Sequence, residues 1–237
     1  MSVIWHDLEC GAYTADLDFW TRLADRHGGP ILDLGAGTGR VTLPLARRGH
    51  AVTALDIDAE LLAELERRAD GLPVRAVCAD ARSFALEERF VLCLVPMQTI
   101  QLLGGPRQRA AFLGCVRRHL RPGGLAALAI AETVECYEEL EGVPGPLPDM
   151  TEREGVIYSS LPIAVRADER GFVLERRRER IDPRGQRSVH DDVIRLDALT
   201  AAELEAEARA TGLRAAGRHE IPDTDEHVGS VVVILDA

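Results

Sequence analysis

Residues 31–39 have the sequence Ile31-Leu32-Asp33-Leu34-Gly35-Ala36-Gly37-Thr38-Gly39. The first four residues predict a short buried strand, and the glycines predict a tight turn whose backbone approaches its neighbours closely. A helix is expected to follow as far as Arg48, and its N-terminus would favour an anionic group. A strand, a glycine-rich turn and a helix in this order are typical of the first unit of a parallel α/β sheet.

The pattern extends in both directions from this stretch. Upstream, Thr14 is expected to cap a helix that ends near the turn Gly28-Gly29-Pro30. Downstream, further apolar strands are predicted at residues 51–55, 74–78, 90–95 and 125–131. Short, almost wholly apolar strands separated by helices imply a parallel sheet that is covered on both faces. We therefore expect a doubly wound α/β fold.

The pattern changes after Glu132. Residues 156–166, 172–181 and 187–196 are strand-like and are joined by turn sequences, which predicts an antiparallel β-meander inserted into the domain. Thr200-Ala201-Ala202-Glu203 is a capping box that would begin a helix. Two last strands, 214–220 and 228–235, are expected to form a hairpin that continues the main sheet.

The composition indicates one globular domain with few candidate partners. The chain has 237 residues, of which 46% are hydrophobic and 28% are charged, enough for one large α/β domain. Its net charge of −11 would repel phosphate backbones, so we expect no nucleic acid as substrate or partner. The five cysteines are scattered without a Cys-x-x-Cys pair, so they are expected to be reduced thiols that hold no metal.

Two features predict a cytoplasmic protein that contacts no membrane. Residues Met1–Glu9 carry two acids and lack the basic and apolar regions of a signal peptide. The apolar runs elsewhere are strand-sized, whereas a membrane span needs about 18–20 apolar residues.

Two acids follow the second and third predicted strands. Asp56 is placed where a carboxylate suits two ribose hydroxyls, and Asp80 is placed to read an adenine amino group. Because the carboxyl ends of parallel strands meet at one edge of a sheet, these acids and the glycine-rich turn would line one nucleoside-sized cleft. The turn is not the dinucleotide fingerprint, because Arg40 occupies the position of its third glycine.

These residues resemble the class I S-adenosylmethionine-dependent methyltransferases of the small-molecule type. The resemblance rests on residues 31–40, on Asp56 and Asp80, and on the Pro122-Gly123-Gly124 segment before the fifth strand. It implies a Rossmann-like sheet with an antiparallel last strand beside the fifth. It also implies S-adenosyl-L-methionine as cofactor, S-adenosyl-L-homocysteine as its product, and no metal. The chain (1–237) would be a single domain with an N-terminal helical cover (1–30), a cofactor-binding core (31–131), the meander as substrate wall (150–197), and a terminal helix and hairpin (198–237).

The resemblance also implies which residues hold the cofactor. Asp33 would approach its amino group, Arg40 its methionine carboxylate, and Asp56 its ribose. Ile57 would pack on the adenine, and Asp80 would read the adenine edge. The full implied set is Tyr13, Asp33, Gly35, Ala36, Gly37, Arg40, Asp56, Ile57, Asp80, Ala81, Val95 and Pro96.

The substrate is expected on the same edge. Gln98, Gln101 and Glu132 are the candidate contacts to the methyl acceptor. The segment Pro96-Met97-Gln98-Thr99 lacks the Asn/Asp-Pro-Pro-aromatic signature of the nucleic-acid enzymes of the family, which agrees with the charge of the chain.

A base is needed only if the acceptor atom carries a proton. His227 is the first candidate, because the turn before the last strand should emerge at the cofactor edge and carries Asp223, Asp225 and Glu226. His6 and His190 are the alternatives.

We therefore expect methyl transfer to an oxygen or nitrogen of a small-molecule acceptor, by a monomer or a homodimer. One alternative is a protein of the same fold that binds the cofactor without transferring the methyl group and serves in assembly or regulation. Another is an NAD(P)-dependent oxidoreductase, which Arg40 at the third-glycine position disfavours.

Overall fold

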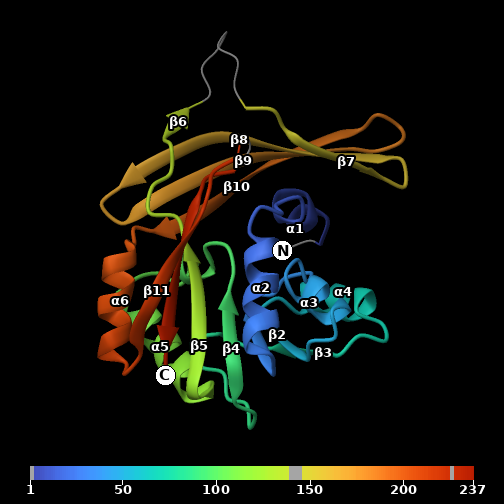
Figure 1. Cartoon of the computed structure of the whole chain (residues 1–237). Helices are drawn as coiled ribbons and strands as arrows, with labels where there is room; N and C mark the ends of the chain where they lie inside the picture. The colour runs from blue at the N-terminus through green and yellow to red at the C-terminus, as the bar shows by residue number, and fades with distance from the viewer. Residues whose placement is uncertain (1–2, 139–145, 225–226) are drawn as a thin grey trace.

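Seven strands form the main sheet of the computed structural model, in the order β11-β12-β5-β4-β1-β2-β3 (Figure 1). The structure describes residues 3–138, 146–224 and 227–237. The main-sheet strands are β1 (Ile31–Leu34), β2 (Val52–Asp56), β3 (Val74–Cys78), β4 (Phe90–Val95), β5 (Leu120–Ile130), β11 (Arg214–Ile221) and β12 (Ser230–Asp236). Strands β1 to β5 pair in parallel, and β12 is antiparallel to both β5 and β11. The predicted doubly wound sheet, with an antiparallel last strand beside the fifth, is confirmed.

Helices cover both faces of this sheet. They are α1 (Val3–Cys10), α2 (Leu17–His27), α3 (Thr42–Arg47), α4 (Ala59–Arg68), α5 (Pro106–His119) and α6 (Ala201–Ala210), with a 3-10 turn η1 (Thr99–Leu102). Side chains of α2 and α3 share a buried cluster with one face, and side chains of α5 and α6 share another with the opposite face. None of the helices in the described ranges is long and apolar enough to cross a membrane.

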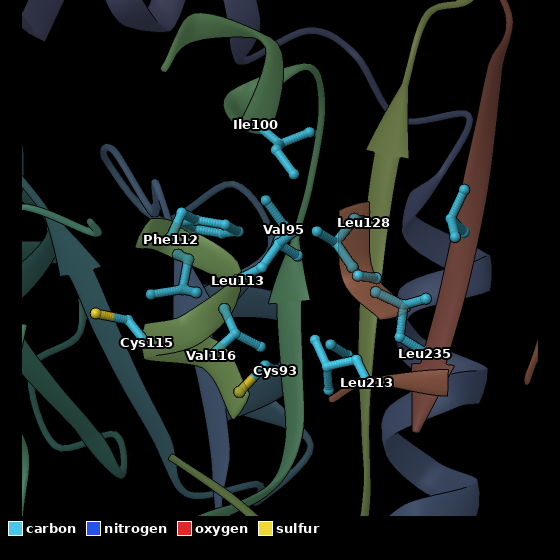
Figure 2. Close-up of a cluster of buried hydrophobic side chains, with 14 of the residues drawn as sticks. Cys93, Val95, Ile100, Phe112, Leu113, Cys115, Val116, Leu128, Leu213 and Leu235 are labelled. Atoms are coloured by element: carbon cyan, nitrogen blue, oxygen red, sulfur yellow. The ribbon is translucent and has the colours of Figure 1, made fainter. Parts of the chain in front are cut away.

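The continuous apolar run of β4 follows from its position between these two layers. Successive side chains of a strand point to opposite faces, so a strand that is covered on both sides must be apolar throughout. Leu92 and Leu94 lie in the cluster with α2, whereas Cys93 and Val95 lie in the cluster with α5. Figure 2 shows Cys93 and Val95 among side chains of α5 and β5.

A second, antiparallel sheet lies over the carboxyl ends of β4 and β5 (Figure 1). Its strands are β6 (Tyr137–Glu138), β7 (Asp149–Arg153), β8 (Val156–Asp168), β9 (Gly171–Ile181) and β10 (Arg187–Asp197), in the order β10-β9-β8-β6 with β7 also on β8. The predicted meander corresponds to β8, β9 and β10. Strands β6 and β7 were not predicted, because β6 is two residues long and β7 has a single apolar residue, Met150, and no apolar alternation.

Several element boundaries differ from the sequence-based expectation. The helix after the glycine-rich turn is α3 from Thr42, but the Leu43 backbone N–H already donates to the Gly39 carbonyl at 2.9 Å, so its first helical hydrogen bond starts at the end of the turn. The residue that precedes α2 is Asp16 rather than Thr14. The Asp16 carboxylate makes no capping hydrogen bond and instead accepts from the Trp20 indole at 2.7 Å.

Candidate active site

The glycine-rich turn at the carboxyl end of β1 packs tightly against the segment after β4. Gly35 and Gly37 have φ angles of 76° and 53°, in the left-handed region that favours glycine. A Cβ on Gly35 would lie 2.6 Å from the Thr99 side chain, and Thr99 donates to the Pro96 carbonyl at 2.9 Å. Beside them, the backbone N–H of Ala36 donates to the β2 carbonyl of residue 55 at 3.1 Å. The turn therefore needs glycine for both conformation and space.

Asp56, the last residue of β2, holds this turn in place. Its Oδ2 accepts from the Gly37 backbone N–H at 2.8 Å, and its Oδ1 accepts from the Asp58 backbone N–H at 3.0 Å. Each carboxylate oxygen keeps a lone pair for a further donor. Ile57, the next residue, leaves 68% of its surface exposed. A carboxylate and an apolar surface thus lie side by side at the end of β2.

Asp33 is buried in β1 with one oxygen unsatisfied. The Thr42 hydroxyl donates to Asp33 Oδ2 at 2.6 Å, while Oδ1 has no hydrogen-bond partner among the described residues. Burial raises the pKa of the Asp33 carboxyl to about 6. An unsatisfied buried oxygen of this kind is the feature expected where a ligand supplies the missing donor.

Arg40 is bound within the chain. Its guanidinium donates to both Asp16 oxygens at 2.6 and 2.8 Å and to the Tyr13 carbonyl at 2.9 Å. Only 8% of the Arg40 side chain is exposed. Within the chain Arg40 thus pairs with Asp16, a partner that local helix-capping rules had not indicated, and its pairing with a ligand carboxylate stays a prediction.

The remaining cofactor candidates follow at the ends of β3 and β4. Asp80 accepts from the Arg82 guanidinium at 2.6 Å, and this partner lowers the pKa of Asp80 to about 2. Ala81 beside it is half-buried. The Val95 side chain is fully buried in the core (Figure 2), and its contact with the cofactor stays a prediction. Pro96 is buried, and its carbonyl accepts from Thr99.

Met97, next along the chain, has a φ of 53°, which residues other than glycine rarely adopt. Such backbone strain concentrates at functional sites. Met97 lies just after β4, the strand between β1, which leads into the glycine-rich turn, and β5.

The three candidate bases lie in three different places. His6 in α1 packs against the turn, with its Nε2 2.3 Å from where a Cβ on Gly37 would lie, and burial lowers the pKa of this imidazole. His190 in β10 packs edge-on to Trp5, with ring centroids 5.7 Å apart. His227 lies 4.9 Å from the buried Tyr13 ring, centroid to centroid. Asp225 and Glu226, which accompanied His227 in the prediction, lie outside the described residues.

The three candidate substrate contacts differ in how many of their side-chain polar groups are already hydrogen-bonded within the chain. Both Gln101 amide donors are used, for the backbone carbonyls of Ala131 and Asp197 at 3.0 and 2.9 Å, so Gln101 is a structural residue. Glu132 accepts from the Ala201 backbone N–H at the start of α6 at 2.6 Å. Gln98 is half-buried, and its side chain has no hydrogen bond within the described ranges.

A pocket of about 490 Å³ lies beside Glu132 at the β5–β12–β11 side of the sheet. It is lined by Glu132, Arg218, His219, Glu220 and Val231. Among the described residues, no group of three His, Cys, Asp or Glu side chains is arranged to hold a metal ion.

Comparisons with known proteins extend these observations. A methyltransferase-domain family model matches residues 31–124. The chain is 33% identical over 108 residues to the cypemycin N-terminal methyltransferase of a Streptomyces species. It is 31% identical over 166 residues to the malonyl-[acyl-carrier protein] O-methyltransferase of Xylella fastidiosa (strain M23). It is 36% identical over 64 residues to an rRNA adenine N-6-methyltransferase of Corynebacterium diphtheriae.

These matches cover 46%, 63% and 27% of this chain, and 44%, 52% and 25% of the three relatives in the same order. The chain thus spans about half or less of their length. Among solved structures, the SAM-bound amino pentose methyltransferase CalS10 from Micromonospora echinaspora superposes with a TM-score of 0.73 and 22% identity. That match covers 100% of this chain and 98% of CalS10, and it shows a shared fold. The resemblance predicted from the glycine-rich turn is confirmed.

Proposed function

We propose that the whole chain, whose residues 31–124 match a methyltransferase-domain family model, transfers the methyl group of S-adenosyl-L-methionine to a nitrogen atom of a small molecule. The convergence of three features at one sheet edge carries this proposal. They are the glycine-rich turn, the Asp56 carboxylate that holds it, and the buried Asp33 oxygen without a partner among the described residues.

The residues at this edge fit the cofactor. The unsatisfied Asp33 Oδ1 suits the ammonium of the methionine portion, since a buried carboxylate is stabilised by an adjacent cation. The free lone pairs of Asp56 suit the two ribose hydroxyls. The exposed Ile57 side chain offers an apolar surface for the adenine ring. Arg40 would contribute indirectly, by fixing Tyr13 and the N-terminal segment through Asp16.

The reaction makes few chemical demands on the chain. The bound cofactor supplies a methyl group that is already activated as part of a sulfonium. The chain must place a nucleophile in line at about 3 Å and exclude water. The second sheet lies over the carboxyl ends of β4 and β5, which suits it as the wall of the acceptor site (Figure 1).

A nitrogen acceptor is favoured by two relatives and by local charge. The cypemycin relative is an N-terminal methyltransferase and CalS10 acts on an amino pentose, whereas the malonyl relative is an O-methyltransferase. The pocket beside β5 is lined by the carboxylates of Glu132 and Glu220 and by the guanidinium of Arg218, so its acids outnumber its arginine, which favours a cationic amine. One matched relative is an rRNA methyltransferase. The net charge of −11 nevertheless disfavours a nucleic-acid acceptor, because it would repel the phosphate backbone.

A protonated amine must lose a proton before it attacks the methyl group. We assign this step to His227, whose ring packs against Tyr13. Tyr13 is itself fixed, because its ring is buried and its carbonyl accepts from Arg40 at 2.9 Å. The His227 imidazole is thus held against the buried Tyr13 ring. The acceptor would lie on the same side of the sheet, within reach of this base.

Transfer of labelled methyl groups tests the proposal. The purified chain is incubated with the methyl-labelled cofactor and a panel of amines, amino sugars and short peptides, and products are identified by mass spectrometry. We expect label on nitrogen, strongly reduced in Asp56→Asn and unchanged in Asp70→Asn, an exposed acid beyond α4. A chain that binds the cofactor but labels none of the acceptors would instead support the assembly or regulatory alternative.

A further inference from the structure

Helix α1 lies between the second sheet and the α2–α4 side of the main domain (Figure 1). Its eight residues, Val3–Cys10, are too few for a stable helix in isolation, so its position depends on the side chains that bind it on either side. Trp5 and Glu9 are four residues apart and share one face, whereas His6 and Asp7 project from another.

The face with His6 and Asp7 binds the glycine-rich turn. The Thr38 hydroxyl donates to Asp7 Oδ1 at 2.8 Å and lies 3.3 Å from His6 Nδ1. Arg68 of α4 donates to the same Asp7 oxygen at 3.0 Å. The His6 ring occupies the space in front of Gly37, so a change in the backbone of the turn must move α1 or break these contacts.

The face with Trp5 and Glu9 binds the second sheet. Arg178 in the centre of β9 donates to both Glu9 oxygens, at 2.7 and 2.6 Å, and the Ser160 hydroxyl of β8 donates to Glu9 Oε1 at 2.7 Å. The guanidinium of Arg178 also lies 5.6 Å from the centre of the Trp5 ring. Trp5 packs edge-on to Tyr158 with ring centroids 5.5 Å apart.

The ion pair between Glu9 and Arg178 is buried, so the two side chains are hard to separate. The two side chains are 4% and 7% exposed, and Asp192 of β10 accepts from the same guanidinium at 2.8 Å. Separating this buried, doubly hydrogen-bonded ion pair would leave Glu9 with only the Ser160 hydroxyl and Arg178 with only Asp192 among the described residues, which is costly in a buried site. Exposed pairs of the same sheet, such as Glu179 with Arg187, lack this property because water replaces the lost partner. Helix α1 and the inner face of the second sheet should consequently move together.

We propose that α1 is a clasp that couples the cofactor site to the acceptor wall, with Glu9 and Arg178 as positioning residues for methyl transfer. The inference rests on the proposed function, because it takes the glycine-rich turn as the cofactor site. Occupation of the turn shifts or orders His6 and Asp7, and the helix passes that change through Glu9 to β8, β9 and β10. The acceptor wall reaches its working position only when the cofactor is bound, so the cofactor binds first.

Trp5 provides a direct readout of this coupling without a known acceptor. The chain has two tryptophans, and Trp20 is fully buried under the main sheet, whereas Trp5 touches Arg178, Tyr158 and His190. The Trp5 emission is obtained as the difference between wild type and Trp5→Phe. S-adenosyl-L-homocysteine is titrated into each variant by calorimetry and, in parallel, by fluorescence.

We expect the Trp5 emission of the wild type to change with the same midpoint as the calorimetric titration. In Glu9→Gln the ligand should still bind while the Trp5 response is lost, and Glu179→Gln should respond like wild type. Calorimetric binding with no Trp5 response in wild type would overturn the clasp and leave the proposed function standing. A full Trp5 response in Glu9→Gln would also overturn it. Absence of binding in wild type would remove the proposed function and the clasp together.

Hydrogen exchange of the unmodified chain gives a second test if Glu9→Gln does not fold. The ligand should slow amide exchange in α1 and also in β8 and β9, although these strands lie across the clasp from the glycine-rich turn. Protection confined to the turn and to β1 and β2 would contradict the coupling.

Discussion

Asp33 is the most informative residue to change, because its protonation state should control cofactor binding. Burial raises the pKa of its carboxyl to about 6. A carboxylate that receives the ammonium of the cofactor must be ionised, so affinity should increase as the pH rises through 6. The ionised fraction is about one tenth at pH 5 and about nine tenths at pH 7, so the Kd for S-adenosyl-L-homocysteine should fall about ninefold between them.

Asp33→Asn keeps the shape of the side chain and an acceptor for the Thr42 hydroxyl, but it cannot ionise. The variant should bind more weakly at pH 7 and show no such slope, as measured by calorimetry at pH 5, 6 and 7 at constant ionic strength. His6 lies nearby, and burial lowers the pKa of its imidazole from 6.5. His6→Gln therefore serves as the control and should keep the slope due to Asp33. A ninefold change in Kd that persists in Asp33→Asn would show that another group causes the pH dependence.

The same residue makes folding depend on pH. Unfolded Asp33 ionises near 3.8 and folded Asp33 near 6, so the folded state retains an extra proton between these values. Its contribution to the free energy of unfolding therefore falls as the pH rises through that window, by about 3 kcal/mol in total. Urea unfolding at pH 4 and pH 7 should show this loss in wild type and not in Asp33→Asn. Equal losses in the two proteins would contradict the assigned pKa.

Three further changes test other parts of the site. Asp56→Ala should weaken S-adenosyl-L-homocysteine binding by about 1–3 kcal/mol in calorimetry, since charge-assisted hydrogen bonds are lost, with an unchanged circular dichroism spectrum. Gly35→Ala places a Cβ 2.6 Å from the Thr99 side chain at a φ of 76°, so it should lower the unfolding free energy by about 1–3 kcal/mol and impair cofactor binding. Gly114→Ala, in α5 with no atom nearer than 3.7 Å, should do neither. His227→Asn should remove the acidic limb of the pH–rate profile at unchanged cofactor affinity, and a surviving limb would make His227 structural.

The main sheet could be predicted from sequence because its signals are local. Each strand is marked by an apolar run bounded by glycine or proline. Once the strands are taken as parallel, an acid that follows a strand can be placed at the carboxyl edge of the sheet. Asp56 was located in this way, and the structure places it against Gly37 as the strand order requires. Leu92 and Cys93 of β4 lie in the clusters on opposite faces of the sheet, so β4 has to be apolar at successive positions.

The residues that were missed or reassigned depend on partners far along the chain. Arg40 pairs with Asp16, 24 residues away, and Arg178 with Glu9, 169 residues away. No periodicity in the sequence indicates which acid a given arginine will meet. Gln101 was predicted to contact the substrate, but its amide donates to the backbone carbonyls of Ala131 and Asp197, which only the folded chain brings together.

Calorimetric titration of the wild-type chain, with S-adenosyl-L-homocysteine and NADH in parallel, shows which cofactor the glycine-rich turn binds. We expect saturable binding of S-adenosyl-L-homocysteine at a single site and no heat of binding for NADH. Saturable binding of NADH, or no binding of S-adenosyl-L-homocysteine by the folded protein, would contradict it.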